Sequence, residues 1–112
     1  MIKLSVLGTR DFTDREMLEE ELSAESFDVL VTSGKLGADR MAQDFALDHD
    51  IPAQVILADY AAHGSEASHR RNLMMIEQAN RVIVFWDRNK RSTFRYLDFI
   101  KERGISFKTV FY

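Results

Sequence analysis

The sequence predicts an α/β fold in which a mostly parallel sheet of about five strands is covered on both faces by about four helices. Short apolar runs alternate with amphipathic stretches along the whole chain, which is the pattern of repeated β-α-β units. The apolar runs are rich in valine, isoleucine and leucine, as expected of strands covered on both faces. The chain has 112 residues, enough for one such domain. We therefore expect a single three-layer, Rossmann-like domain over residues 1–112.

Five segments have the composition of strands. Their apolar residues stop where glycine, serine or charged residues begin a turn. They cover residues 2–7, 27–32, 54–57, 81–86 and 107–111. Residues 59–64, which follow the third strand, are expected to form a loop.

The first two helices are predicted from their end signals. The first follows a capping box, with Thr13 as N-cap and Glu16 at the third helical position, and continues to about Ser23. The second spans residues 38–50, and Ile51-Pro52 ends it because the residue before proline is pushed out of the α region.

The last two helices are predicted in the same way. The third starts at Ser65 or Ser68 and runs to Ala79. The fourth starts with Ser92 as its cap and ends before Gly104, because glycine is favoured just after a helix. In this arrangement glycine and polar residues follow the strands, at the edge where parallel α/β sheets bind their ligands.

Composition and charge exclude several classes of protein. The sequence has no cysteine, which excludes disulfides and cysteine-ligated metals, and its histidines lack metal-ligand spacing with acids. With 15 basic and 18 acidic residues its net charge is −3, which argues against a protein that coats nucleic acid. No apolar run is long enough to span a bilayer, and the first residues lack the features of a signal peptide. We therefore expect a cytoplasmic protein without a metal site.

The charged residues are unevenly distributed. Acidic residues gather at 14–25, whereas basic residues gather at 69–71 and 88–95. Local basic patches on an acidic protein suit a compact anion such as a nucleotide phosphate.

The first candidate ligand turn, Gly8-Thr9-Arg10, follows the first strand. Glycine allows a ligand to approach the backbone, Thr9 offers a hydroxyl, and Arg10 offers a forked cation that matches phosphate oxygens. The alternative is an ordinary turn between a strand and a helix, with an arginine on the surface.

The second candidate turn occupies residues 33–39, after the second strand. Two glycines three residues apart before a helix leave N–H groups free for an anion, which the helix dipole also favours. The pattern is neither the full dinucleotide fingerprint nor a P-loop. We interpret Ser33, Gly34, Gly37 and Asp39 as ligand residues, although an acid in a first helical turn also occurs without any function.

A third candidate group is Arg70-Arg71-Asn72, near the start of the third helix. Asn72 disfavours a helix interior and can both donate and accept hydrogen bonds. The alternative is that these residues belong to a solvated helix face.

A fourth candidate group follows the fourth strand. Trp86 ends that strand, Asp87 follows it, and Ser92-Thr93 opens the last helix. The Trp86 ring could floor a pocket or stack on a base, or equally fill the core. Ser92-Thr93 would form a second anion-binding turn or an ordinary cap.

A series of short motifs runs in order along nearly the whole chain. It comprises Gly8-Thr9-Arg10-Asp11-Phe12, Ser33-Gly34, Gly37-Ala38-Asp39-Arg40, Ile51-Pro52, Ala58-Asp59-Tyr60, His63-Gly64, Arg71-Asn72, Met74 and Phe85-Trp86-Asp87. This series resembles the YspA-like branch of the SLOG superfamily, which is named after the Smf/DprA and Lonely Guy (LOG) proteins. The resemblance implies a Rossmann-like sheet with a site for a nucleotide or nucleotide derivative at the strand ends. The implied pocket contains Gly8, Thr9, Arg10, Ser33, Gly34, Gly37, Asp39, Arg71 and Asn72, and is closed by Trp86 and Thr93.

The sequence departs from that family pattern in two turns. Lys35-Leu36 is bulkier than the family's glycine-rich second loop, and Ser92 stands where the family's late Gly-Thr turn has glycine. LOG enzymes, which cleave the base from a nucleoside monophosphate, have a glutamate shortly after that turn. Here no acid follows Thr93 until Asp98, which weakens the enzymatic interpretation because stabilising an oxocarbenium-like centre needs a nearby carboxylate.

Three functions remain open from the sequence. The first is a module that binds or senses a nucleotide-derived small molecule, with no catalytic residue assigned. The second is an N-glycosidase-type hydrolase of a nucleoside phosphate or ADP-ribose-like compound, with Arg71 on the phosphate and Asp39, Asp87 or Asp98 as carboxylate. The third is a partner-binding or DNA-associated module that has lost the ligand. The resemblance also implies self-association, for which Phe111-Tyr112 is a candidate interface.

Overall fold

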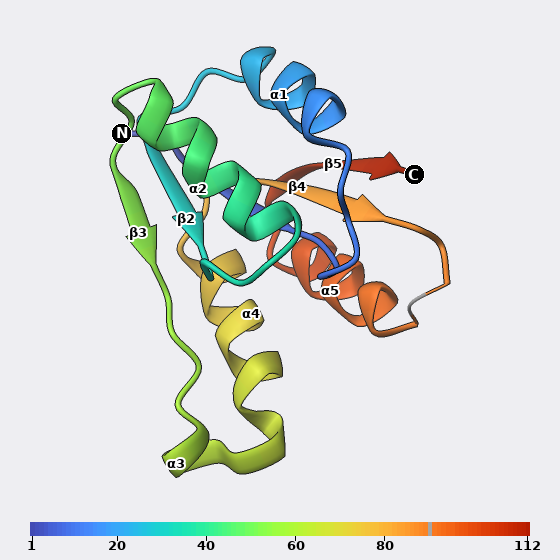
Figure 1. Ribbon diagram of the computed structural model, residues 1–112. Helices are drawn as coiled ribbons and strands as arrows, with labels where there is room; N and C mark the ends of the chain where they lie inside the picture. Colours follow the sequence, from blue (N-terminus) through green and yellow to red (C-terminus); the bar gives the residue numbers. More distant parts are fainter. Residues whose placement is uncertain (90) are drawn as a thin grey trace.

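A parallel sheet of five strands forms the centre of the molecule, in the order β3-β2-β1-β4-β5 (Figure 1). The computed structural model describes residues 1–89 and 91–112, and the side chain of Ser92, predicted as a cap and ligand residue, lies outside this description. The strands are β1 (Lys3–Leu7), β2 (Val29–Thr32), β3 (Ala53–Val55), β4 (Arg81–Trp86) and β5 (Ser106–Phe111). The predicted α/β fold is confirmed.

Helices cover both faces of this sheet, because parallel neighbours must be joined by long crossovers. They are α1 (Arg15–Ser23), α2 (Ala38–Asp48), α3 (Tyr60–His63), α4 (Ala67–Glu77) and α5 (Ser92–Glu102), with a 3-10 turn, η1 (Gly64–Glu66). α1 and α2 pack on one face, and α4 and α5 pack on the other (Figure 1). β1 and β4 are neighbours at the point where the strand order reverses, so this is the switch point of the sheet.

β1 shows how a single strand serves both faces of the sheet. Leu4 and Val6 lie in the core beneath α1 and α2, whereas Leu7 lies in the core beneath α4 and α5. Side chains alternate in this way because successive residues of a strand point to opposite faces. Each such buried apolar side chain contributes about 1.5–3 kcal/mol to folding, and the two cores hold the three layers together.

The first two helices each differ from the prediction at one end. The Asp14 carboxylate accepts a hydrogen bond from the Met17 N–H at 3.1 Å, so Asp14 is the N-cap and the prediction of Thr13 is wrong. A carboxylate is favoured there because it meets both an unpaired N–H and the positive end of the helix dipole. α2 ends at Asp48 rather than at position 50, where Asp50 has a φ of 56° and cannot continue the helix.

Two later boundaries also differ. Residues 59–64, predicted as a loop, contain α3, whose cap Asp59 accepts a hydrogen bond from the Ala62 N–H at 3.0 Å. In α5 the cap position falls on Arg91 and Ser92 is the first helical residue. Arg91 already has helical backbone angles (φ −64°, ψ −30°), so the predicted cap is one residue too late.

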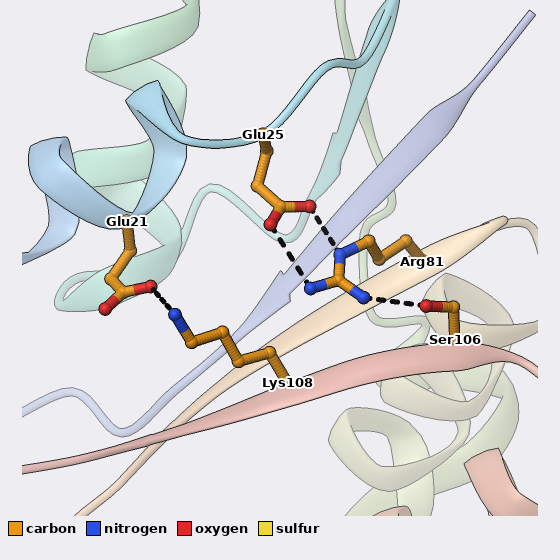
Figure 2. Close-up of polar contacts among 5 residues, drawn as sticks. All are labelled: Glu21, Glu25, Arg81, Ser106 and Lys108. Carbon is orange, nitrogen blue, oxygen red and sulfur yellow. Dashed lines mark hydrogen bonds and ion pairs between the residues drawn. The ribbon is translucent and has the colours of Figure 1, made fainter.

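Ion pairs tie α1 and the turn after it to the strands. Figure 2 shows the Arg81 guanidinium of β4 donating to both oxygens of Glu25 and, at 2.7 Å, to the hydroxyl of Ser106 in β5. Lys108 of β5 donates to Glu21 of α1 at 2.6 Å (Figure 2). Arg81 and Ser106 are the first residues of their strands. The cluster of Arg81, Glu25 and Ser106 therefore lies at the amino ends of the strands, opposite the carboxyl ends where ligands are expected.

Candidate functional site

A cavity of about 150 Å³ lies at the carboxyl ends of β1 and β4. Leu7 from β1 and Val84 and Phe85 from β4 form its apolar wall. The cavity therefore occupies the switch point, which is where open parallel α/β sheets place their ligands.

Five of the predicted ligand residues line this cavity. They are Gly8, Thr9, Asp39, Asn72 and Thr93. They come from the turn after β1, the first turn of α2, the middle of α4 and the first turn of α5. The fold thus gathers residues from four separate segments around one space, and their contact with a ligand stays a prediction.

Close packing between two turns explains the presence of glycine at two of the predicted ligand positions. A Cβ on Gly8 would lie 2.5 Å from the Cβ of Ala38, the first residue of α2. A Cβ on Gly37 would lie 2.2 Å from the carbonyl oxygen of Thr9, and Gly37 also has a φ of 98°. Both glycines allow the turns after β1 and β2 to touch, so their presence does not require a ligand that approaches the backbone.

The Thr9 hydroxyl is already engaged within the protein. It donates to the Asp11 carboxylate and also contacts the Tyr112 hydroxyl, which itself donates to Asp11 at 3.1 Å. Burial raises the pKa of Tyr112, and the Asp11 carboxylate raises it further, against the effect of the hydrogen bond with Thr9. The hydroxyl proton of Thr9 is therefore already used within the chain.

Asp39 is a buried carboxylate in the cavity wall, with only 2% of its surface exposed. The Ser33 hydroxyl donates to this carboxylate, and the Thr32 hydroxyl donates to the Asp39 carbonyl at 2.9 Å. Burial raises the pKa of Asp39, whereas the Ser33 hydrogen bond and the charges of Lys35 and Arg71 oppose this rise. Ser33, a predicted ligand residue, thus acts on the cavity through Asp39.

A chain of polar side chains runs from Arg71 to the surface between α4 and α5. Arg71, a residue that is 5% exposed, donates from its guanidinium to the Asn72 amide oxygen through Nε at 3.2 Å and Nη2 at 3.1 Å. Asn72 Nδ2 donates to the Tyr96 hydroxyl at 3.0 Å, and His69 Nδ1 lies 3.1 Å from the same oxygen. His69 Nε2 lies 2.8 Å from Arg95 Nη2. Arg71 thus stands behind the cavity wall and orients Asn72.

Besides Ser33, Gly37 and Arg71, four more of the predicted residues do not line the cavity. Arg10 is exposed, and Gly34 turns the loop after β2 with a φ of 70°. Trp86 is 7% exposed and packs edge-on against Phe94, with ring centres 4.7 Å apart, so the core interpretation of Trp86 is the one its contacts favour. Asp87 accepts a hydrogen bond from a backbone N–H of the next turn.

Sequence reasoning missed three polar residues that line the cavity, namely Lys35, Ser68 and Tyr96. Lys35 lies between the two glycines of the second turn, where the family resemblance predicts only a bulkier loop. Ser68 precedes Asn72 by four residues on α4, and Tyr96 follows Thr93 by three on α5. Residues at these spacings share a helix face, so the predicted ligand residues could have pointed to both.

Three further predictions concern features outside the cavity. Among the described residues, no group of three or more histidines and acids is placed to hold a metal ion. In the same part of the chain, no helix has the length and apolar character needed to cross a membrane. Phe111 lies under the Arg88 guanidinium at 4.1 Å and Tyr112 packs against Phe12, so both make contacts within the chain. Self-association through them stays a prediction.

Comparison with known proteins identifies a similar fold and no family. No protein-family model matches the chain, and no curated protein matches it. The chain is similar to the crystal structure of a predicted subunit of a tRNA methyltransferase from Methanocaldococcus jannaschii, with a TM-score of 0.53 and 14% sequence identity. The match covers 97% of this chain and 69% of the other. At this identity the likeness shows the Rossmann-like α/β fold alone.

Proposed function

We propose that this chain binds a nucleotide or a nucleotide-derived small molecule, with its phosphate in the cavity at the ends of β1 and β4. The observation that carries the proposal is the position of that cavity, at the switch point and lined by the first turns of two helices. Asp39 is the second residue of α2 and Thr93 the second residue of α5, so both helix N-termini face the cavity. Helix N-termini favour anions through their unpaired N–H groups and their dipole.

The charges around the cavity support a phosphate ligand. Lys35 contributes a cation to the wall, and Arg71 contributes a second behind Asn72. Both act on Asp39, which is the buried acid of the site. Around the cavity, one acidic side chain is thus opposed by two basic side chains and by the positive ends of two helix dipoles. This distribution of charge favours an anion.

The size of the cavity limits which part of a ligand it encloses. Pockets for drug-sized ligands usually measure about 300–1,000 Å³. At about 150 Å³ this cavity suits a phosphate with an attached sugar, so the base of a nucleotide would lie along the rim. The resemblance to the YspA-like branch of the SLOG superfamily supports the same ligand class.

A binding screen tests the proposal. The panel contains inorganic phosphate, ribose 5-phosphate, the ribonucleoside 5′-monophosphates, NAD and ADP-ribose, with neutral nucleosides for comparison. A ligand at about 100 times its Kd stabilises the folded state by about 2.7 kcal/mol, which raises Tm by several degrees in a domain of this size. We expect this shift with phosphate compounds and not with nucleosides. A flat screen would contradict the proposal and favour a partner-binding module.

Lys35→Met and Lys101→Met form a matched pair for the same screen. Both remove the amine and keep an unbranched apolar chain, but Lys35 lines the cavity and Lys101 is exposed near the end of α5. We expect Lys35→Met to weaken phosphate binding about tenfold or more, because a charge-assisted contact is lost. Lys101→Met should bind as the parent does. Equal effects of the two substitutions would place the phosphate elsewhere.

Asp39 favours one second candidate function, cleavage of the bond between base and sugar. Of the three carboxylates proposed for that reaction, Asp39 lines the cavity, whereas Asp98 is exposed in a separate groove between α4 and α5. A carboxylate near the sugar would stabilise the positive charge that develops as the base leaves. Release of free base from nucleoside monophosphates, followed by chromatography, tests this function. Release that Asp39→Asn abolishes would support it, and no release by the parent protein would exclude it for those substrates.

A further inference from the structure

The Tyr96 hydroxyl has two neighbours that both come from α4. Asn72 Nδ2 lies 3.0 Å from the Tyr96 oxygen, and His69 Nδ1 lies 3.1 Å from it. Tyr96 itself belongs to α5 and lines the cavity together with Asn72. The directions of these two hydrogen bonds determine whether the Tyr96 hydroxyl can still donate its proton to a ligand.

The orientation of the Asn72 amide is set by Arg71. Nε and Nη2 of Arg71 both lie within 3.2 Å of Asn72 Oδ1. A guanidinium can only donate, so the atom that faces it must be the amide oxygen. Nδ2 then faces Tyr96 and, as an NH₂ group, donates to the Tyr96 oxygen.

The tautomer of His69 is set in the same way by Arg95. Arg95 Nη2 lies 2.8 Å from His69 Nε2. Since the guanidinium donates, Nε2 must accept and therefore carries no proton. The ring proton of His69 is then on Nδ1, which donates to the Tyr96 oxygen.

The Tyr96 oxygen thus accepts two hydrogen bonds, and its own O–H remains to be donated. Within the described part of the chain, Tyr96 makes no third hydrogen bond that would use this proton. We propose that Tyr96 donates its hydroxyl proton to an acceptor oxygen of the ligand in the cavity, a phosphate oxygen of a sugar phosphate or nucleotide. This inference rests on the proposed function and adds a residue that selects ligands with an acceptor at this point.

The hydrogen-bonding groups around Tyr96 favour a ligand acceptor over a ligand donor. Arg71 and Arg95 have no acceptor to offer, so they fix the donating directions of Asn72 and His69. A ligand group that could only donate would meet the Tyr96 O–H and leave two donors face to face. An anionic oxygen would instead complete the hydrogen bonds of the hydroxyl, in charge-assisted form.

Calorimetric binding to Tyr96→Phe tests the proposal. The probes are ribose 5-phosphate and adenosine 5′-monophosphate, with adenosine as the neutral comparison. Loss of one hydrogen bond to a charged oxygen should weaken binding of the two phosphate probes about tenfold or more. Adenosine binding should change much less, because its phosphate oxygens are absent.

Ser106→Ala is the control for this substitution. It removes a hydrogen-bonded hydroxyl at the opposite end of the sheet, where Ser106 accepts from Arg81 at 2.7 Å. It should leave binding of both phosphate probes unchanged. Unchanged affinity of Tyr96→Phe would overturn this inference alone, whereas failure of the parent protein to bind either probe would overturn the proposed function with it.

The tautomer of His69 provides a second test that needs no ligand and no stable Tyr96 variant. Long-range ¹H–¹⁵N correlation spectra distinguish a protonated from an unprotonated ring nitrogen, and His69→Gln identifies the signals that belong to His69. We expect a protonated Nδ1 and an unprotonated Nε2. A protonated Nε2 with a bare Nδ1 would make Tyr96 the donor to His69 and overturn the inference.

Discussion

Gly37 lies so close to the turn after β1 that a Cβ at this position would stand 2.2 Å from the carbonyl oxygen of Thr9. Its φ of 98° is also one that residues with a side chain rarely adopt. The contact holds the turn after β2 against the turn after β1. It thereby fixes the separation of Thr9 from Lys35 and Asp39, which line the same cavity.

Gly37→Ala should therefore destabilise the protein by more than backbone strain alone. With φ 98° and ψ −144°, Gly37 lies near a backbone region that is essentially reserved for glycine, where a side chain costs about 1–3 kcal/mol, and displacement of the Thr9 carbonyl adds to this cost. Gly104→Ala is the control for a positive φ without a clash, because Gly104 has a φ of 67° and no atom within 4 Å of its would-be Cβ. Urea unfolding followed by Trp86 fluorescence measures both variants. Equal losses of stability would show that the contact with Thr9 carries no energy.

Asp39 should make stability depend on pH in a defined direction. Burial raises the pKa of Asp39 above the ordinary value of 3.8. Between the pKa of the unfolded chain and that of the folded protein, the folded state holds more protons. The free energy of unfolding therefore falls as pH rises through this window.

Asp39→Asn removes this titration. The stability of the parent relative to Asp39→Asn should decrease as pH rises above the ordinary carboxyl pKa of 3.8, because the parent alone must ionise a buried carboxyl. Chemical unfolding of both proteins at each pH measures the difference. A difference that stays level or increases with pH would contradict a raised pKa.

The cluster of Arg81, Glu25 and Ser106 should matter for stability and not for binding. The side chains of Arg81 and Glu25 are 30% and 14% exposed, so removing one partner leaves a largely buried charge unpaired. We expect Arg81→Met to cost about 1–3 kcal/mol. Lys108→Met breaks a pair in which Lys108 is 48% exposed, and should cost about 1 kcal/mol or less. A larger effect at Lys108 than at Arg81 would reverse this ranking.

Arg71→Ala and Arg10→Ala compare the effects of removing a buried arginine and an exposed one on binding and on Tm. If each arginine contacts the ligand phosphate as predicted, each substitution weakens binding by about 1.5–3 kcal/mol. Arg71→Ala should also lower Tm, since Asn72 loses the two donors that orient it. Arg10→Ala should leave Tm unchanged, because Arg10 lies on the surface. Nucleotide affinity that survives both substitutions would show that the predicted phosphate contacts are wrong.

The types and order of the elements were predictable because they depend on local pattern. Apolar runs such as Val82–Phe85 appear in β4 as expected, since a strand buried on both faces needs apolar residues at every position. The placement of glycine and polar residues after the strands was predictable for the same reason. The ends of helices and strands were less predictable. Thr13 and Asp14 are both favourable N-cap residues, and the backbone angles of the folded chain determine which of them is the cap.

Five of the predicted ligand residues reached the cavity because the parallel topology brings every strand end to one edge. The sequence by itself therefore determined the fold class, the edge of the sheet at which the cavity lies, and much of the cavity wall. Only the tertiary structure decided that Lys35 and Tyr96 join this wall. The same holds for the packing of Trp86 in the core and for the hydrogen bond that the Thr9 hydroxyl donates to Asp11. These outcomes depend on how α2, α4 and α5 pack across the sheet. Contacts between elements distant in the chain leave no periodic trace in the sequence.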